Sequence, residues 1–241
     1  MIAVILAAGI ASRLRPLTND TPKCLLDVKG KSLLERSMNA LIDAGISEFV
    51  IVTGYLNQKI ENFVNANYKQ INVTFIHNDV YELTNNIYSL WLSRKVVDAK
   101  DFLLLDSDLL YDPQIVKNVL ADKNENVLTL IRHELGEEEM KVVTDEKGAI
   151  VEISKTCDPK MAAGESLGIE KIGKNYSKAL FIELDKMMNQ EHLENKFYEL
   201  AFERLIQQGH TYSVLDASNY FSCELDTVED FENAKVKIPL P

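Results

Sequence analysis

The residues with the clearest chemistry lie in an N-terminal stretch, AAGIASRLRPLTNDTPK, that follows an apolar run. Gly9 and Ala11 are small enough for backbone N–H groups to approach a ligand, and successive N–H groups bind anions. Arg13 supplies a planar fork of donors and Lys23 a compact positive charge. The stretch matches neither GxGxxG nor GxxxxGK[ST], which excludes the common dinucleotide and P-loop motifs. It could bind a polyphosphate, although a merely solvated basic loop has the same composition.

Two acidic stretches could complete such a site by holding a divalent cation. LLLDSDLLYD carries Asp106 and Asp108 at the end of an apolar run, and SCELDTVEDFENA carries Glu224 and Asp226 ahead of a helical pattern. Mg²⁺ in proteins is commonly held by one or two carboxylates together with water and phosphate oxygens. Most single aspartates are only solvated or cap helices, so the residue types alone leave both interpretations open.

The first half of the chain alternates apolar runs with helical patterns, which predicts a parallel sheet. The predicted strands are 2–8, 49–54, 71–77 and 101–108, and the predicted helices are 31–45, 56–66 and 86–96. With right-handed crossovers this order gives an α/β, Rossmann-like doubly wound sheet. Ligands of such sheets bind beyond the carboxyl ends of the strands. The basic stretch and the DSD acids both lie at such ends, so we expect them to meet in one cleft.

The second half predicts a small β-rich substrate lobe. Predicted strands are 126–132, 139–145 and 149–155, then TYSVLDA and YFSCELD; predicted helices are 176–190 and 196–208, with a last one from 227. The DEKG sequence between the second and third strands is a good hairpin turn. Without a linker or repeat, we expect a single domain over 1–241. It would comprise a nucleotide-binding part (about 1–125), an acceptor-binding lobe (about 126–225) and a C-terminal helix (227–241).

Composition limits the possible partners. The net charge is −11, which argues against nucleic acid and anionic membranes as partners. The three cysteines are widely spaced, without a CxxC pair, so neither a disulfide framework nor a zinc site is expected. Free thiols suit a reducing compartment, and the apolar N-terminus predicts a buried strand rather than a signal peptide. We expect a cytoplasmic protein without membrane insertion, and a homodimer is compatible with the sequence.

The stretch LAAGIASRLRPLTNDTPKCLLDVKGKSLLE resembles the L-A-A-G-x-G-[ST]-R-[LM]-x-P…P-K signature of the nucleotidyltransferases that make sugar nucleotides and related head groups. Ala11 stands where many of these enzymes have glycine. The resemblance implies a GT-A-like fold in which this loop wraps a nucleoside triphosphate, with Arg13 and Lys23 as catalytic cations. It also implies Mg²⁺ as cofactor, with Asp108 and Asp226 as its ligands. The implied nucleotide-binding residues are Leu6, Ala7, Ala8, Gly9, Ala11, Ser12, Gly54, Tyr55, Asn85, Asn86 and Ser89.

A second stretch, HNDVYELTNNIYSLWLSR, resembles the N-x-x-Y…NN-x-Y-S-L segment of bacterial phosphocholine and aminoethylphosphonate cytidylyltransferases. This resemblance implies transfer of CMP from CTP to 2-aminoethylphosphonate or phosphocholine, releasing pyrophosphate, for decoration of surface glycans or lipids. The acceptor-binding candidates are Asp106, Lys141, Lys155, Glu165, Gly168 and Glu224. His77 is a further candidate for the cleft.

The acceptor and the class of activity both have alternatives. Quaternary ammonium groups are usually bound by aromatic cages, and the single tryptophan, Trp91, is expected to pack in a helix. We therefore favour 2-aminoethylphosphonate over phosphocholine. One alternative is a sugar-1-phosphate nucleotidylyltransferase that uses UTP or dTTP. A second is a non-catalytic, nucleotide-binding regulatory subunit.

Overall fold

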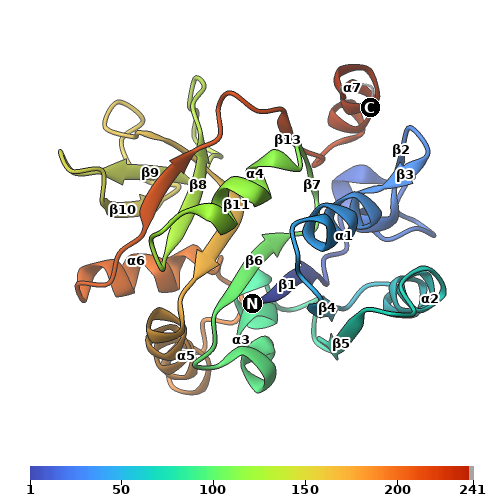
Figure 1. Cartoon of the computed structure of the whole chain (residues 1–241), viewed down its shortest axis with the longest axis horizontal. Helices are drawn as coiled ribbons and strands as arrows, with labels where there is room; N and C mark the ends of the chain where they lie inside the picture. The colour runs from blue at the N-terminus through green and yellow to red at the C-terminus, as the bar shows by residue number, and fades with distance from the viewer. Residues whose placement is uncertain (239–241) are drawn as a thin grey trace.

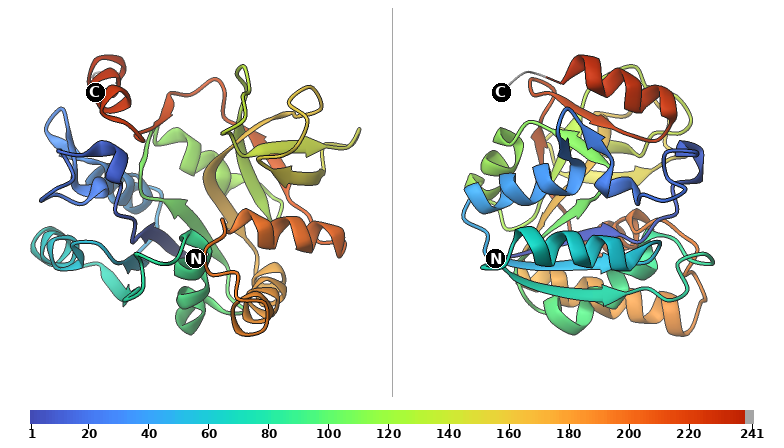
Figure 2. Two further views of the ribbon diagram at one scale, coloured as in Figure 1. Left: turned by 180° about the vertical axis from the view of Figure 1, so that it is seen from behind. Right: turned by 90° about the vertical axis from the view of Figure 1, so that its right-hand side faces the viewer.

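A nine-stranded mixed sheet forms the centre of the molecule, with helices on both faces (Figures 1 and 2). The computed structural model describes residues 1–238. The strands of this sheet are β1 (Ile2–Ala7), β4 (Glu48–Thr53), β5 (Asn72–His77), β6 (Phe102–Asp106), β8 (Val127–Ile131), β9 (Lys141–Thr144), β10 (Ile150–Ser154), β11 (Gly164–Ile172) and β12 (Ser213–Asp216). Their order is β10-β9-β11-β6-β1-β4-β5, and β8 lies between β11 and β12.

Seven α-helices occur within the described residues. They are α1 (Leu33–Asp43), α2 (Asn57–Asn67), α3 (Asn86–Val97), α4 (Gln114–Ala121), α5 (Lys174–Asn189), α6 (Glu199–Gln207) and α7 (Val228–Lys237). None of them is long and apolar enough to cross a membrane. The predicted helix 227–241 is α7, and residues 239–241 lie outside the described part.

The sheet is buried on both faces because its apolar strands alternate their side chains between two cores. From β1, Val4 and Leu6 pack with α3, α5 and α6, whereas Ala3 and Ile5 pack with α1, α2 and α4. Ser32, followed by Glu35 three residues on, is the pattern of a helix cap, and its hydroxyl accepts a hydrogen bond from the Glu35 N–H at 3.1 Å at the start of α1. This two-sided packing fixes the carboxyl ends of β1 and β6 side by side.

The parallel half of the prediction is confirmed. β1 pairs in parallel with β4 and β6, and β4 pairs in parallel with β5. The DEKG hairpin between β9 and β10 is also present, with its glycine, Gly148, at a φ of 80°. The predicted strand 101–108 ends at Asp106, and a separate short strand, β7 (Leu109–Tyr111), follows.

Several elements were not predicted from the sequence, and α4 and β11 are the longest of them. Helix α4 follows directly on β7, and the nine-residue β11 was interpreted only as a substrate segment. β11 carries Glu165, Gly168 and Glu170 among its apolar residues, which hides the strand pattern. It pairs antiparallel with β6 on one side and with β8 and β9 on the other, so it joins the parallel half of the sheet to the β-rich half.

Candidate active site

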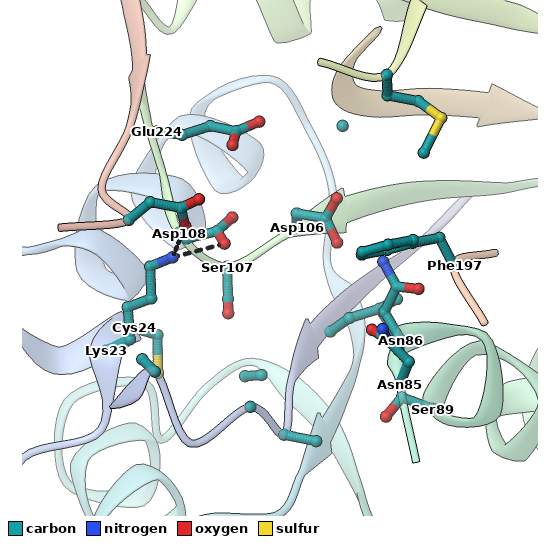
Figure 3. A pocket seen from close by; sticks show the side chains of 18 of the residues that line it. Lys23, Cys24, Asn85, Asn86, Ser89, Asp106, Ser107, Asp108, Phe197 and Glu224 are labelled. Atoms are coloured by element: carbon teal, nitrogen blue, oxygen red, sulfur yellow. Dashed lines mark hydrogen bonds and ion pairs between the residues drawn. The ribbon is translucent and has the colours of Figure 1, made fainter. Parts of the chain in front are cut away.

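A cavity of about 340 Å³ opens where the carboxyl ends of β1 and β6 meet the start of α3 and the β-rich half (Figure 3). Leu6 and Asp106 are register partners at these strand ends. Most of the predicted site residues line this cavity: Leu6, Ala7, Ala8, Gly9, Ala11, Arg13, Lys23, Asn85, Asn86, Ser89, Asp106, Asp108, Lys155, Glu165, Gly168, Glu224 and Asp226. The fold therefore brings distant stretches of the chain into one cleft.

The N-terminal loop enters the cavity through a left-handed residue. Ala11 has a φ of 51°, and a short 3-10 turn over Ser12–Leu14 follows it. The Ala11 carbonyl accepts hydrogen bonds from the Leu14 N–H at 3.1 Å and from the Thr18 hydroxyl at 2.9 Å. Glycine adopts this conformation freely, whereas alanine is strained in it by about 1 kcal/mol. The loop holds the conformation through these two bonds.

Lys23 lies between two carboxylates at one end of the cavity. Its Nζ is 2.9 Å from Asp108 Oδ2 and 2.7 Å from Asp226 Oδ1, and the Arg13 guanidinium is 2.5 Å from Asp226 Oδ2. Burial opposes the charge on Lys23, but the two carboxylates outweigh it and raise the pKa of Lys23. Burial likewise works against ionised Asp226, yet Lys23 and Arg13 hold its pKa below the usual value. Lys23 and Asp226 are therefore charged at neutral pH.

A short ribbon places Asp226 beside Asp108. Strand β13 (Ser222–Glu224) pairs antiparallel with β7, and the Leu225 N–H donates to the Asp108 carbonyl at 3.2 Å. Thr227, with Asp230 three residues on, has the sequence pattern of a helix cap, and the two residues form a reciprocal capping box at the start of α7. A third core packs α7 against the loop that carries Arg13 and Lys23, and against the hairpin of β2 (Asp27–Val28) and β3 (Lys31–Ser32) (Figure 2). The position of Asp226 thus depends on the C-terminal helix.

The inner end of the cavity is acidic. Asp106, Glu170, Tyr198 and Glu199 come together there, and we call these four residues the carboxyl cluster. The Tyr198 hydroxyl donates to Asp106 Oδ2 at 3.0 Å. Desolvation and the neighbouring negative charges raise the pKa of Asp106 and of Glu170 well above their usual values. Desolvation also raises the pKa of Glu199 to about 7. This end therefore favours a positive group.

Gly168 makes room for one of these acids. It has a φ of 75°, and a Cβ added there would lie 2.7 Å from Asp106 Oδ2. Only glycine fits both the left-handed conformation and the contact. The predicted acceptor residue Gly168 therefore shapes the cavity by its lack of a side chain.

Lys155 and Glu165 approach the cavity from the β-rich half. The Lys155 ammonium lies 4.7 Å from the centre of the Phe197 ring and 3.7 Å from Glu138 Oε2. Glu165 Oε2 is 2.6 Å from His133 Nε2. Burial raises the pKa of Glu165, and it outweighs the hydrogen bond from His133, which lowers this pKa. One cation and one carboxylate are thus available near the acidic end.

Four predicted site residues do not line the cavity. Ser12 lies in the 3-10 turn behind it. Gly54 packs behind Ala8 and Tyr81, since an added Cβ would lie 2.6 Å from the Ala8 carbonyl oxygen. The Tyr55 hydroxyl donates to the carbonyls of Thr18 and Asn19, both at 2.8 Å, and so supports the N-terminal loop from outside.

Lys141 is the fourth, and the structure corrects its expected contact with the acceptor. It is 1% exposed, and its Nζ donates to the carbonyls of Glu137, Glu139 and Lys155 at 3.4, 3.2 and 2.6 Å. These bonds consume all three ammonium donors. Lys141 therefore ties the 137–139 segment to the end of β10.

Several cavity residues were missed by the sequence analysis. His77 is exposed, and its neighbour Asn78 lines the cavity instead, donating to Thr84 Oγ1 at 3.0 Å and to Ser89 Oγ at 3.2 Å. Phe197 and Glu199 also line it, from the segment that leads into α6. No local motif marks these two residues, because only the docking of α6 brings them here. Trp91 packs in α3 as expected, with its Nε1–H donating to Asp185 Oδ1 at 2.7 Å.

The residues present suit a divalent cation. The Lys23 ammonium touches one oxygen of Asp108 and one of Asp226, so these carboxylates converge on a single cation position. Within residues 1–238 no group of three or more His, Cys, Asp or Glu side chains is placed to hold a metal. A cation here would therefore rely on two carboxylates, with water and phosphate oxygens completing its coordination, as Mg²⁺ commonly does.

Two relatives resemble this chain over most of its length. A CTP:phosphoglutamine cytidylyltransferase from Campylobacter jejuni is 26% identical over 96% of this chain and 98% of its own length. A choline-phosphate cytidylyltransferase from Haemophilus influenzae is 33% identical over 64% of this chain and 62% of its own.

A solved structure and a family profile complete the comparison. The CTP:phosphocholine cytidylyltransferase structure from Streptococcus pneumoniae superposes with a TM-score of 0.82 at 23% identity, covering 98% of both chains, which shows a shared fold. The nucleotidyl transferase profile matches residues 2–154, more than half of the chain. Signature loop, fold and profile agree, and the chain belongs to the nucleotidyl transferase family.

Proposed function

We propose that this nucleotidyltransferase is a Mg²⁺-dependent cytidylyltransferase that transfers CMP from CTP to a small phosphorylated or phosphonate amine. 2-Aminoethylphosphonate and phosphocholine are the acceptors proposed, with pyrophosphate as the second product. One observation carries the proposal. The same cavity joins an end that carries the cations Arg13 and Lys23 to an acidic end at Asp106 and Glu199. A nucleoside triphosphate suits the first end and an amine the second.

The relatives support the choice of nucleotide and acceptor. The Campylobacter and Haemophilus proteins are named as cytidylyltransferases, the first for phosphoglutamine and the second for choline phosphate. A 2-aminoethylphosphonate cytidylyltransferase from Lancefieldella rimae is 35% identical over 44% of this chain. From these relatives we propose that the chain supplies activated head groups for surface glycans or lipids. A cytoplasmic location is proposed from the free cysteines, of which Cys24 and Cys157 are buried.

The proposed reaction is an in-line displacement at the α-phosphorus of CTP. An acceptor phosphate or phosphonate oxygen forms the new P–O bond while the bond to the β-phosphate bridging oxygen breaks and pyrophosphate leaves with the electron pair. The acceptor oxygen is already ionised at neutral pH, so no general base is required. Arg13 and Lys23 would neutralise charge on the α-phosphate and the leaving pyrophosphate, which is the main demand of such transfers.

Mg²⁺ would be held by Asp108 and Asp226. When bound, it would supply positive charge to the triphosphate oxygens and so ease the departure of pyrophosphate. In this proposal Lys23 exchanges its two carboxylate partners for phosphate oxygens. Lys155, the cation on the acceptor side, would orient the attacking phosphate or phosphonate.

Pyrophosphate release tests the proposal. The purified chain is incubated with Mg²⁺, with CTP, UTP or dTTP, and with each of 2-aminoethylphosphonate, phosphoethanolamine, phosphocholine and glucose 1-phosphate. We expect release that needs CTP, an amine acceptor and Mg²⁺ together, and that stops when EDTA is added. Faster turnover of glucose 1-phosphate with UTP or dTTP would instead establish a sugar-1-phosphate nucleotidylyltransferase. No release under any combination would favour a regulatory, nucleotide-binding role.

A further inference from the structure

The carboxyl cluster has more carboxyl groups than cationic partners among the described residues. Asp106 ends β6, Glu170 lies on β11, and Tyr198 and Glu199 lie at the start of α6. Figure 3 shows Asp106 between the Lys23–Asp108 pair and Phe197, which directly precedes Tyr198 in the sequence. Three carboxyl groups from three separate elements are thus gathered at one end of the cavity.

Glu199 lines the cavity with one carboxylate oxygen unpaired among the described residues. It is 7% exposed, and within residues 1–238 its Oε2 accepts no hydrogen bond. Glu170 is fully buried near Glu199 and does not line the cavity. Within the same residues its Oε2 has no hydrogen-bond partner, and its Oε1 accepts from the Ser166 hydroxyl at 3.4 Å. Buried carboxylates in proteins are normally paired, because desolvation penalises an unpaired charge.

No cation of the described chain forms an ion pair with Asp106, Glu170 or Glu199. Lys155 is the nearest positive influence on Glu199, but its ammonium is engaged elsewhere, against the Phe197 ring and Glu138. Asp106 and Glu199 therefore present acceptor oxygens toward the cavity. A cationic ligand with N–H donors would satisfy these oxygens.

The lining distinguishes between two kinds of cationic ligand. A primary ammonium has three N–H donors for carboxylate oxygens, whereas a trimethylammonium has none and depends on aromatic faces. Tyr81 and Phe197 are the only aromatic residues among those lining the described cavity, and Lys155 covers the Phe197 ring. The geometry fits an ammonium that donates hydrogen bonds.

We propose that the carboxyl cluster binds a protonated primary amine of the acceptor, and that Glu199 sets the preference for this amine over trimethylated or uncharged analogues. This inference rests on the proposed function, because it concerns the acceptor of the same cavity. It assigns the amine to Glu199 and Asp106, with Glu170 buried beside them, and it leaves the phosphonate or phosphate to Lys155.

Acceptor pairs that differ only at the amine test the proposal. Phosphoethanolamine is compared with phosphocholine, and 2-aminoethylphosphonate with propylphosphonate, in which a methyl group replaces the ammonium. We expect kcat/KM to favour each primary amine by about 100-fold or more, since a site built for hydrogen bonds rejects analogues that lack them. Glu199→Gln should reduce both ratios by about tenfold or more, with the KM for CTP unchanged.

Two controls separate specificity from structural damage. Glu203→Gln removes a carboxylate from the same helix, outside the cavity lining, and should leave both ratios unchanged. Glu199→Gln should unfold at the same or a higher temperature than the wild type, because it removes a buried unpaired charge. Glu170→Gln is a second cluster variant and should also lower the preference for the amine.

Calorimetry separates this inference from the proposed function. Binding of 2-aminoethylphosphonate and of propylphosphonate is measured with and without α,β-methylene-CTP, which prevents transfer. Tighter binding of the amine, lost in Glu199→Gln, supports the inference even if no pyrophosphate is ever released. Equal binding of the two phosphonates, faster turnover of phosphocholine than phosphoethanolamine, or unchanged ratios in Glu199→Gln would each overturn it.

Discussion

Lys23 shows how a single side chain depends on distant parts of the chain. Its two carboxylate partners lie 85 and 203 residues further along the sequence. The side chain is 13% exposed, so water screens these pairs only weakly. Its local motif, a lysine after proline, predicted a phosphate contact but gave no reason to expect this double pairing.

Replacing Lys23 by alanine should reduce kcat for pyrophosphate release by about 10²–10³-fold, because a preorganised positive charge is lost beside the reacting phosphates. Asp108 and Asp226 would also repel each other without the ammonium. Stopped assays with CTP and the best acceptor measure the change. Lys31→Ala, an exposed lysine on β3, is the matched control and should retain activity. Wild-type activity in the Lys23 variant would contradict the assigned role.

His133 and Glu165 form a pair whose charge depends on pH. Burial disfavours the imidazolium, but the hydrogen bond to Glu165 at 2.6 Å outweighs it and raises the pKa of His133 above the usual 6.5. Protonated His133 therefore stabilises the fold. This contribution is complete below about pH 6.5 and is lost as the pH rises through the higher pKa of the folded state.

NMR titration of the His133 ring protons should give a pKa above 6.5 that falls when Glu165 is replaced by glutamine. The exposed turn residue Glu146 provides the matched control, and Glu146→Gln should leave the titration of His133 in place. A titration of His133 that does not respond to Glu165→Gln would show that the pair is not formed in solution.

At the scale of elements, β11 combines sheet continuity with a local irregularity. Its pairing with β8 shifts register between Ser166 and Glu170, and Gly168 lies within this interruption at a φ of 75°. The bend leaves room for the Asp106 carboxylate. The nine-residue strand β11 thus connects the two halves of the sheet and also shapes the acidic end of the cavity.

Gly168→Ala should destabilise the protein by about 2–4 kcal/mol, since it adds left-handed strain and a clash with Asp106. Gly148→Ala is the matched control. Gly148 has a similar φ of 80° but nothing within 4 Å of an added Cβ, so its cost should be only about 1 kcal/mol. Urea unfolding measures both values. Equal losses in the two variants would show that the contact with Asp106 is unimportant.

Helix α7 holds a site residue at its N-terminal edge. The Thr227 hydroxyl accepts from the Asp230 N–H at 3.1 Å, and the Asp230 carboxylate accepts from the Thr227 N–H at 2.8 Å. Asp226 directly precedes this box. Loosening the start of the helix should therefore affect the carboxylate that pairs with Lys23.

Thr227→Ala should cost about 1 kcal/mol of stability and also lower activity, because Asp226 loses its fixed position. Ser32→Ala removes the comparable cap of α1, away from the cavity, and should cost similar stability without loss of activity. Urea unfolding and pyrophosphate release are measured on both variants. An equal loss of activity in both would mean that α7 has no special part in positioning Asp226.

At the scale of the whole molecule, one sheet runs from β5 to β10 across the boundary predicted near residue 125. β11 pairs with β6 from the first part and with β8 and β9 from the second. If the strands of one part unfolded, the edge strand of the other part of the sheet would be left unpaired. The predicted single domain should therefore unfold as one unit.

Differential scanning calorimetry should show a single transition whose van't Hoff and calorimetric enthalpies agree. Intrinsic fluorescence of Trp91, on α3, and far-ultraviolet circular dichroism should give the same midpoint. Two resolved transitions, or different midpoints for these probes, would show that the nucleotide and acceptor parts unfold separately.

The net charge of −11 makes local arrangement decisive for an anionic substrate. Arg13 and Lys23 reach the cavity from one loop, and Lys155 reaches it from β10's far end. The overall negative charge of the chain disfavours the binding of any polyanion. The fold concentrates these three cations at one cleft, where their fields act at short range.

The sequence by itself determined the elements of the parallel half, the helix caps at Ser32 and Thr227, the phosphate-type loop and the acids at Asp108 and Asp226. These features depend on periodicity and on contacts between near neighbours, which a linear pattern records. The polar residues within β11 concealed that strand, since Glu165, Gly168 and Glu170 break the alternation of its apolar residues.

Only the tertiary structure decided which side chains meet. It placed Lys23 between Asp108 and Asp226, and it buried Lys141, whose ammonium binds backbone carbonyls. It also brought Glu170 and Glu199 close to Asp106. These contacts depend on register across β6 and β11 and on the docking of α6, which involve residues far apart in the chain. Burial and pairing of charge arise from that packing, and no local pattern encodes them.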